Sequence, residues 1–174
     1  MSRYWLMKSE PETFSIDDLA RAKNGTTRWD GVRNYQARNF LRDEISLGDG
    51  VLFYHSSASP PAVVGLARVA RAGYPDPTQF DPKDDHCDPE SPRDAPRWFA
   101  VDIAFDEKFP RPVTLPELRA DAVLGDMVLL RKGSRLSVQP VSAAEWDAVL
   151  KLAVAGAAKK PKAPAARSRS RSST

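Results

Sequence analysis

The strongest fold signal in the chain lies at Ala62–Ala70, which reads AVVGLARVA. Its β-branched and small apolar residues predict a buried strand, interrupted once by Gly65. A glycine inside a strand indicates a bend or the close approach of another backbone, as in a small barrel. The sequence therefore predicts a curved sheet built around this strand.

The rest of the expected sheet comes from both sides of this strand. Apolar residues at alternating positions predict further strands at Arg3–Lys8, Val51–Ser56, Trp98–Phe105 and Arg135–Val141. Val123–Leu130 fits a helix or a strand equally well. About six strands mixed with short helices predict an α+β fold, in the form of a small β-barrel with flanking helices.

Helix-start signals punctuate the strands. A Ser or Thr followed three residues later by an acidic residue forms a capping box, and this pattern occurs at Ser15–Asp18, Thr114–Glu117 and Ser142–Glu145. Asn34 is expected to cap one more helix. Between the strands, Tyr74–Pro96 is rich in Pro and Asp and has no periodicity. We expect a long, exposed and mobile loop there.

The composition is that of one globular domain. The chain has 174 residues, of which 41% are hydrophobic and 9% aromatic. Its single cysteine, Cys87, excludes an internal disulfide and points to a reducing compartment, and neither His55 nor His86 stands at metal-ligand spacing. No apolar run approaches the roughly 20 residues that span a bilayer, and no signal peptide is visible. We expect a cytoplasmic monomer (nucleoid-associated in a bacterium, nuclear in a eukaryote) with no metal, cofactor or membrane.

The net charge of +3 hides an uneven distribution of charge. Residues 159–174 hold six of the 26 basic residues and none of the 23 acidic ones, so the remainder carries about −3. The composition after Val154 turns to Ala, Lys, Pro, Arg and Ser, which cannot bury enough surface to fold. We expect one domain over residues 1–154 and a disordered basic tail over 155–174. Cations of this tail suit contacts with phosphates; they are Lys159, Lys160, Lys162, Arg167, Arg169 and Arg171.

The segment Trp29–Asn34 concentrates the groups that a nucleotide would need. An indole, a carboxylate, a flexible glycine, a guanidinium and an amide stand within six residues, WDGVRN. Stacking, edge recognition and charge pairing together suit a base with its phosphate. We expect Arg33 and Arg38 to contact phosphates, although a solvated helix face would explain them equally. Taken alone, Trp29 is more often a core residue.

Several phrases of the chain resemble the EVE-domain family, in family order and over roughly residues 2–152. They are Tyr4–Pro11, Trp29–Asn39, Phe53–Ser56, Val64–Ala67, Tyr74–Asp76 and Arg135–Val141. The resemblance implies a PUA-like β-barrel that reads nucleic acid by accepting a flipped-out modified base, with modified cytosine in DNA the leading ligand. Carried onto this chain, the implied pocket would draw on Lys8, Ser9, Trp29, Asp30, Gly31, Val32, Asn34, Tyr54, His55, Ser56, Leu136 and Ser137.

Each group of that pocket has an expected role. Trp29 would stack on the base, and Asp30 would accept from an exocyclic amine. Ser9, His55 and Ser56 would form hydrogen bonds with the remaining edge of the base. Leu136 and Tyr54 would line an apolar niche. A hydrogen-bonded core histidine is as good an interpretation of His55, because it alternates with apolar residues of a strand.

Other function classes remain open at this point. ASCH-type relatives imply a hydrolase of modified pyrimidine nucleosides, for which Lys8-Ser9-Glu10 offers a base, a hydroxyl and a carboxylate. Adjacent strand residues point to opposite faces, however, so these three groups cannot converge without a bulge. An RNA-binding PUA-like module and a purely structural barrel are further alternatives. We expect a non-catalytic reader.

Overall fold

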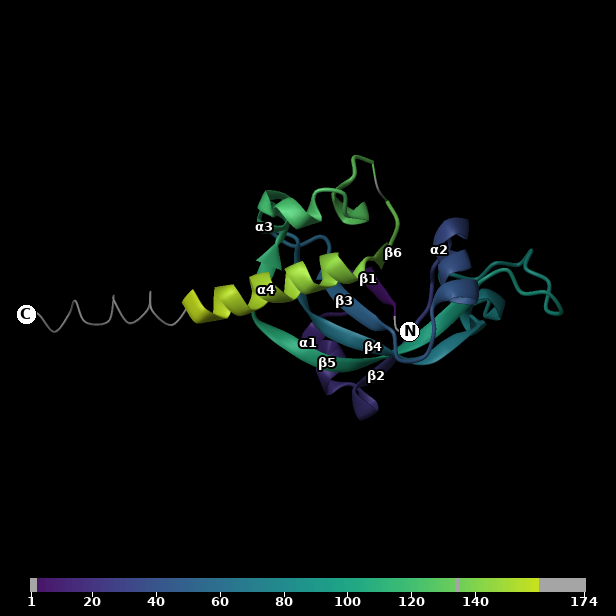
Figure 1. Cartoon of the computed structure of the whole chain (residues 1–174). Helices are drawn as coiled ribbons and strands as arrows, with labels where there is room; N and C mark the ends of the chain where they lie inside the picture. The colour runs from purple at the N-terminus through teal and green to yellow at the C-terminus, as the bar shows by residue number, and fades with distance from the viewer. Residues whose placement is uncertain (1–2, 134, 160–174) are drawn as a thin grey trace, which may run out of the picture.

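The computed structural model describes residues 3–133 and 135–159. Within them, six strands form one mixed sheet in the order β2-β5-β4-β3-β1-β6 (Figure 1). Strands β1 and β3 run parallel, and the other neighbours are antiparallel. The strands are β1 (Tyr4–Ser9), β2 (Thr26–Trp29), β3 (Gly50–His55), β4 (Ala62–Pro75), β5 (Phe99–Thr114) and β6 (Val138–Val141).

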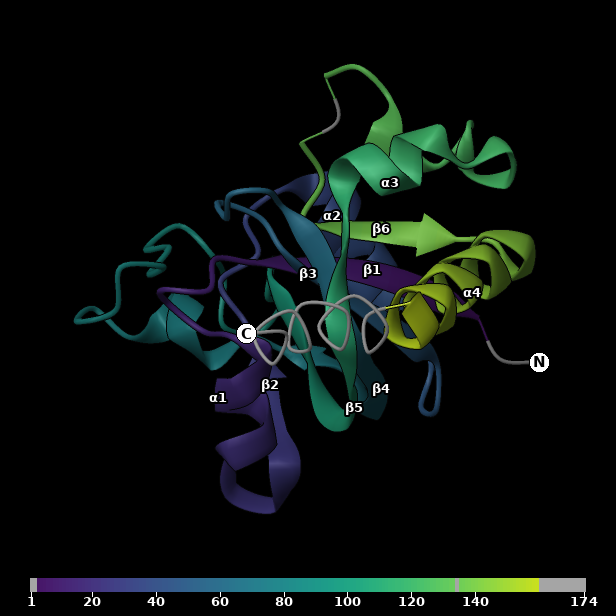
Figure 2. The same cartoon turned by 90° about the vertical axis from the view of Figure 1, so that its left-hand side faces the viewer.

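Short helices surround the sheet, and one longer helix, α4, lies along it against β5 (Figures 1 and 2). None of the helices in the described ranges has the length and apolar character needed to cross a membrane. The α-helices are α1 (Ile16–Arg21), α2 (Tyr35–Asn39), α3 (Leu115–Ala120) and α4 (Ala143–Lys159). A π-helical turn, η2 (Phe40–Glu44), continues α2, and 3-10 turns are η1 (Lys23–Gly25), η3 (Pro77–Phe80), η4 (Ala122–Leu124) and η5 (Val128–Leu130).

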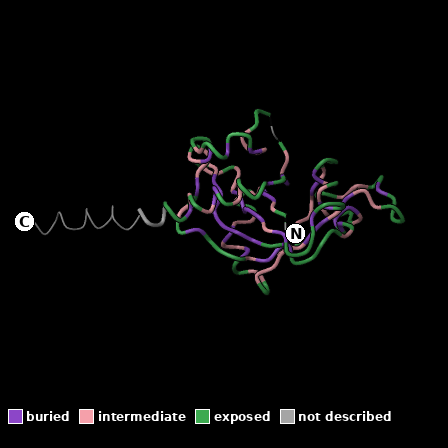
Figure 3. Tube along the Cα trace, viewed as in Figure 1, coloured by how far each residue is buried: buried purple, intermediate pink, exposed green. Residues whose placement is uncertain are grey.

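Each face of the sheet buries its own apolar cluster. Trp5 and Met7 of β1 belong to the first cluster, which α1 and α2 complete, whereas Leu6 between them belongs to the second, which α3 and α4 complete. Successive side chains of a strand point to opposite faces, which explains this division. Figure 3 shows the buried residues concentrated along the central strands. The expected α+β class is confirmed.

Gly65 lies where two backbones meet. A Cβ atom on Gly65 would stand 2.3 Å from the carbonyl oxygen of Glu107 on β5. The sheet therefore curves as expected, but it does not close into the predicted barrel. Among the described residues, β2 and β6 form its two edges and do not pair with each other. Both edge strands have only four residues, which leaves too little backbone to complete a ring of hydrogen bonds.

The helix-start predictions are confirmed. Reciprocal capping bonds join the residues of Ser15–Asp18, Thr114–Glu117 and Ser142–Glu145. Asn34 caps α2 by accepting a hydrogen bond from the backbone N–H of Ala37. These signals succeed because each depends on residues three positions apart.

Strand boundaries were predicted less well. Strands β4 and β5 are 14 and 16 residues long and extend beyond Ala70 and Phe105, because they pair with each other along almost their whole length. Strand β6 begins at Val138 instead of Arg135. Val123–Leu130, which fitted helix or strand, forms two 3-10 turns. Strand β2 was not predicted at all.

The prediction of an exposed, mobile loop over Tyr74–Pro96 is wrong for its first part. Asp76 and Gln79 are fully buried; Asp76 caps η3, and Gln79 lies within it. The side-chain amide of Gln79 donates to the carbonyl oxygens of Asp76 (2.7 Å) and Trp98 (2.9 Å). Buried polar groups, which leave no hydrophobic pattern, hold this segment to the sheet.

At its C-terminal end the fold extends beyond the expected boundary at residue 154. Helix α4 runs to Lys159. The remaining predicted phosphate contacts lie outside the described residues; they are Lys160, Lys162, Arg167, Arg169 and Arg171.

Candidate functional site

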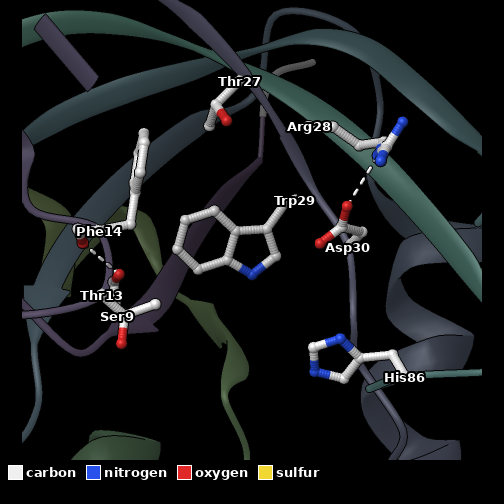
Figure 4. Close-up of a pocket in the computed structure, with 8 residues that line it drawn as sticks. All are labelled: Ser9, Thr13, Phe14, Thr27, Arg28, Trp29, Asp30 and His86. Carbon is white, nitrogen blue, oxygen red and sulfur yellow. Dashed lines mark hydrogen bonds and ion pairs between the residues drawn. The ribbon is translucent and has the colours of Figure 1, made fainter. Parts of the chain in front are cut away.

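An open pocket of about 460 Å³ lies at the end of β2 (Figure 4). Its walls come from the end of β1 and the loop after it, from β2, and from one residue of the segment between η3 and β5. Segments more than 50 positions apart in the chain thus meet here. The lining residues are Ser9, Thr13, Phe14, Thr27, Arg28, Trp29, Asp30 and His86.

The indole of Trp29 is the central surface of this pocket. It is half-buried, packs partly on the first apolar cluster and meets the ring of Phe53 edge-on at 5.8 Å between centroids. Figure 4 shows the ring between Phe14 and Ser9 on one side and Asp30 and His86 on the other. Its Nε1–H donates to no group of residues 3–133 or 135–159. Trp29 therefore offers a flat ring and a spare hydrogen-bond donor.

His86 enters the pocket because Gly31 has no side chain. A Cβ atom on Gly31 would lie 2.9 Å from Cε1 and Nε2 of His86. The backbone of Gly31 also has φ +77°, a conformation that favours glycine. The Nδ1 of His86 lies 3.1 Å from Oδ1 of Asp84. Because a carboxylate only accepts, this contact places the proton of a neutral imidazole on Nδ1 and leaves Nε2 as an acceptor.

A buried ion pair fixes the segment that carries His86. Oδ2 of Asp76 accepts from the backbone N–H of Gly31 (2.8 Å) and from Nη1 of Arg33 (3.1 Å), while Thr78 donates to Oδ1. Arg33 also donates from Nη2 to the carbonyl oxygen of His86 (2.6 Å). Burial would raise the pKa of Asp76, but the bonds from Thr78, Gly31 and Arg33 outweigh it and lower the pKa.

Arg33 and Arg38, expected to contact phosphates, are used inside the protein. The Asp76–Arg33 pair leaves the Arg33 side chain only 22% exposed. Arg38 donates from Nη1 to the carbonyl oxygen of Arg97 (2.6 Å) and lies over the ring of Tyr35 at 5.0 Å. Burial lowers the pKa of Arg38. Both guanidiniums therefore join distant segments of the fold.

Lys8 and Tyr54 lie on the face of the sheet opposite Ser9. They are neighbours in the parallel pairing of β1 with β3, and Tyr54 belongs to the second apolar cluster. Burial lowers the pKa of Lys8 and raises that of Tyr54. The strand alternation that separates Leu6 from Met7 also separates Lys8 from Ser9, so the structure does not bring Lys8 or Tyr54 into the pocket.

Three polar residues at the ends of β1 and β3 form hydrogen bonds with nearby backbone groups. Ser9 lines the pocket, but its hydroxyl donates to the carbonyl oxygen of Phe14 at 2.5 Å. The N–H of Ser56 donates to the carbonyl oxygen of Ser9. Nε2 of His55 accepts from the N–H of Ile16 at 3.1 Å, and burial lowers the His55 pKa. His55 is thus the hydrogen-bonded structural histidine of the two interpretations.

The remaining predicted pocket residues support the fold. Val32 is buried in the first cluster, and Asn34 caps α2. Leu136 packs against the first cluster, and the carbonyl oxygen of Ser137 accepts from the N–H of Lys8. Of the predicted set, only Ser9, Trp29 and Asp30 line the pocket directly.

Sequence reasoning missed five lining residues. Phe14 and Thr13 follow the end of β1, where the sequence gives no regular pattern. Thr27 shares a face with Trp29, so recognition of β2 would have predicted it. No local signal identifies His86, which reaches the pocket through contacts with distant residues. Within the described ranges, no group of three His, Cys, Asp or Glu residues is placed to hold a metal ion.

Comparison with known proteins identifies the family. The family model described as "EVE domain" matches residues 3–152. The chain belongs to the EVE-domain family. Thymocyte nuclear protein 1 of Homo sapiens is 43% identical over 169 residues, which cover 87% of this chain and 74% of the human protein.

Solved structures share the fold of this EVE domain. A protein from Pseudomonas putida is 50% identical with a TM-score of 0.82 and covers 86% of this chain and 99% of its own. The human THYN1 protein, solved in complex with DNA containing 5-methylcytosine, is 43% identical with a TM-score of 0.82. The match covers 87% of this chain and 98% of the human chain. The α+β fold expected from the resemblance is confirmed, with the six strands in one open sheet.

Proposed function

We propose that this EVE domain reads nucleic acid by binding a flipped-out modified base, with 5-methylcytosine in DNA as the favoured ligand. The observation that carries the proposal is the half-buried indole of Trp29 in an open pocket, with an N–H that has no partner among the described residues. Support comes from the human THYN1 protein, whose structure holds DNA containing 5-methylcytosine. An aromatic face with polar groups around it suits an extruded base.

The lining groups match the chemistry of a cytosine. Its exocyclic amine donates two hydrogen bonds, for which Oδ1 of Asp30 and Nε2 of His86 are acceptors. The ring nitrogen and carbonyl accept, for which the hydroxyls of Thr13 and Thr27 are donors. Stacking contributes about 1–3 kcal/mol, and extrusion of a base costs a few kcal/mol. Stacking and edge bonds together are therefore needed for binding.

The geometry gives less support to the hydrolase alternative. Lys8 lies on the opposite face of β1 from Ser9, and the Ser9 hydroxyl already donates to a carbonyl oxygen. No base is positioned to activate that hydroxyl among the described residues. We propose a non-catalytic monomer located with its nucleic acid, in the cytoplasm or nucleoid of a bacterium or the nucleus of a eukaryote. The alternative ligand for the same pocket is a modified base in RNA.

Replacement of Trp29 tests the pocket. Trp29→Ala should bring the affinity ratio between duplexes with 5-methylcytosine and with cytosine to about one, whereas Trp29→Phe should keep part of it. Because Trp29 is half-buried, its loss should cost less than the about 3–5 kcal/mol of a core tryptophan. Fluorescence anisotropy at fixed salt measures the ratio, and urea unfolding measures stability.

Trp146 is the matched control, since it is also half-buried but stacks on Tyr4 away from the pocket. Trp146→Ala should lower stability and leave the ratio unchanged. A ratio that survives in folded Trp29→Ala would show that the pocket does not read the base. Any product formed from modified nucleosides, detected by mass spectrometry, would favour the hydrolase instead.

A further inference from the structure

A second hollow of about 510 Å³ adjoins the base pocket on the outer side of β2, β5 and β4. The two hollows share Thr27 and Arg28 in their linings, so they lie next to each other along β2. The lining of the second hollow is largely polar and holds three cations and one carboxylate, unlike the apolar faces of the sheet. The lining residues are Lys23, Asn24, Thr26, Thr27, Arg28, Arg71, Tyr74 and Asp102.

Strand pairing brings two arginines together in this hollow. Arg28 of β2 and Arg71 of β4 are both partners of Asp102 on β5, which lies between them. Asp102 is engaged by Tyr74, whose hydroxyl donates to Oδ1 at 2.5 Å. Burial and this hydrogen bond raise the pKa of Tyr74, so the hydroxyl stays protonated. The acceptor capacity of Asp102 is thereby partly occupied.

Two cations of the hollow have no carboxylate partner within residues 3–133 and 135–159. The guanidinium of Arg71 lies over the ring of Tyr74, 3.8 Å from the centroid, and forms no ion pair with a described residue. Lys23 is exposed, and its ammonium likewise has no ion pair in that part of the chain. Stacking on an aromatic ring holds a guanidinium in place while leaving its N–H donors free.

Arg28 connects the hollow with the base pocket. Its Nε donates to Oδ2 of Asp30 at 2.8 Å, and Asp30 lines the base pocket. The hydrogen bond to Asp30 raises the pKa of Arg28. Arg28 also lines the hollow, together with Lys23 and Arg71. Cations gather here although the protein before residue 159 carries about −3 overall.

We propose that this hollow binds the backbone phosphates that flank a base held against Trp29. The proposal rests on the proposed function, because the ligand is the nucleotide chain whose base enters the adjoining pocket. Phosphates are recognised by guanidinium and ammonium groups and by neutral donors such as the side chains of Asn24 and Thr26. The hollow thus replaces Arg33 and Arg38 as the phosphate contact of the folded domain.

Salt-dependent binding of the full chain tests this assignment. Lys23→Gln, Arg71→Gln and the double variant should weaken binding to methylated and unmethylated duplexes by the same factor. The slope of log affinity against log salt should become less steep by about 0.9 for each lost phosphate contact. The ratio between the two duplexes should persist, since the base pocket is unchanged.

Lys132→Gln is the matched control. Lys132 is exposed and follows η5, which contacts β6 at the sheet edge opposite β2. It should leave both affinity and slope unchanged. The Lys23 ammonium has no ion pair among the described residues, so Lys23→Gln tests the proposal even if Arg71→Gln fails to fold. Thermal unfolding monitors the folding of both variants.

The possible outcomes separate this proposal from the proposed function. Unchanged slopes in both single variants would place the phosphates elsewhere and overturn the assignment. A duplex ratio that falls together with affinity would show that the hollow reads the base, which also overturns it. Reduced slopes in a protein that never preferred 5-methylcytosine would support the phosphate site and overturn the base reader.

Discussion

His55 links the stability of the fold to pH near neutrality. Its Nε2 accepts a hydrogen bond from the N–H of Ile16, the first residue of α1, and protonation would remove that acceptor. Burial lowers the His55 pKa below its ordinary value of 6.5. Because the unfolded chain keeps the ordinary pKa of 6.5, it binds more protons than the folded chain once the pH falls below that value. The free energy of unfolding is therefore unaffected by His55 above about pH 6.5 and decreases progressively below it.

We predict that the melting temperature falls more steeply below about pH 6.5 in the natural protein than in His55→Gln. The glutamine carbonyl accepts the same bond but does not titrate. His86→Gln is the control, because His86 is the other histidine of the chain and lies in the pocket. The prediction would be contradicted if the melting temperatures of the natural protein and His55→Gln changed with pH in the same way between about pH 8 and about pH 5.

At the scale of elements, the pairing of β4 with β5 depends on Gly65. An added methyl group would lie 2.3 Å from the carbonyl oxygen of Glu107, so the strands would have to separate. Gly65→Ala should therefore lower the free energy of unfolding by about 1–3 kcal/mol. The control is Gly125→Ala, where φ is −53° and the nearest atom is 3.7 Å away. Urea unfolding that gives equal stabilities for the two variants would show that the strands tolerate the methyl group.

The segment between β4 and β5 is held by Asp76, so its loss should reach the base pocket. Asp76→Ala removes the acceptor for Gly31 and leaves Arg33 without its carboxylate partner. We predict a stability loss of about 3 kcal/mol, because one half of a buried pair remains. The released segment should also misplace His86 and reduce the preference for a methylated duplex.

Asp85→Ala removes an exposed carboxylate from the same segment and is the control for charge. It should alter neither the stability nor the duplex preference. A preference that is unaffected in folded Asp76→Ala would indicate that His86 takes no part in reading the base. Denaturant titration and anisotropy measure the two quantities on the same preparations.

At the scale of the whole molecule, charge is divided between the domain and its C-terminal end. Residues 160–174 contain five cations and no carboxylate side chain. Their removal should weaken binding to all duplexes alike and make the salt slope less steep by about 4.5, taking about 0.9 for each phosphate. The preference for a modified base should remain, because phosphate contacts carry no sequence information.

Truncation after Lys159 is the appropriate cut, since α4 extends to that residue. The comparison requires titrations of both lengths of the protein at several salt concentrations. Equal slopes would assign the last 15 residues to solubility. A lost preference would instead move base specificity out of the folded domain.

Local chemistry in the sequence determined much of this protein. Apolar runs and alternation predicted five of the six strands, the capping residues predicted the helix starts, and Gly65 marked the meeting of two backbones. The residues of Trp29–Asn34 likewise marked Trp29 and Asp30 as candidate pocket residues, whereas Ser9 entered the predicted pocket only through the family resemblance. These features depend on neighbouring residues and the period of a strand or helix, so a short stretch of sequence encodes them.

Tertiary structure decided the features that depend on distant partners. Strand β2 has little apolar pattern and forms because β5 supplies its hydrogen bonds. Asp76 is buried because Gly31 and Arg33, more than 40 positions away, satisfy its charge, and the same contacts take Arg33 from phosphate and bring His86 to Trp29. A polar side chain gives no local sign of whether water or a remote segment will be its partner, and only the folded chain makes that choice.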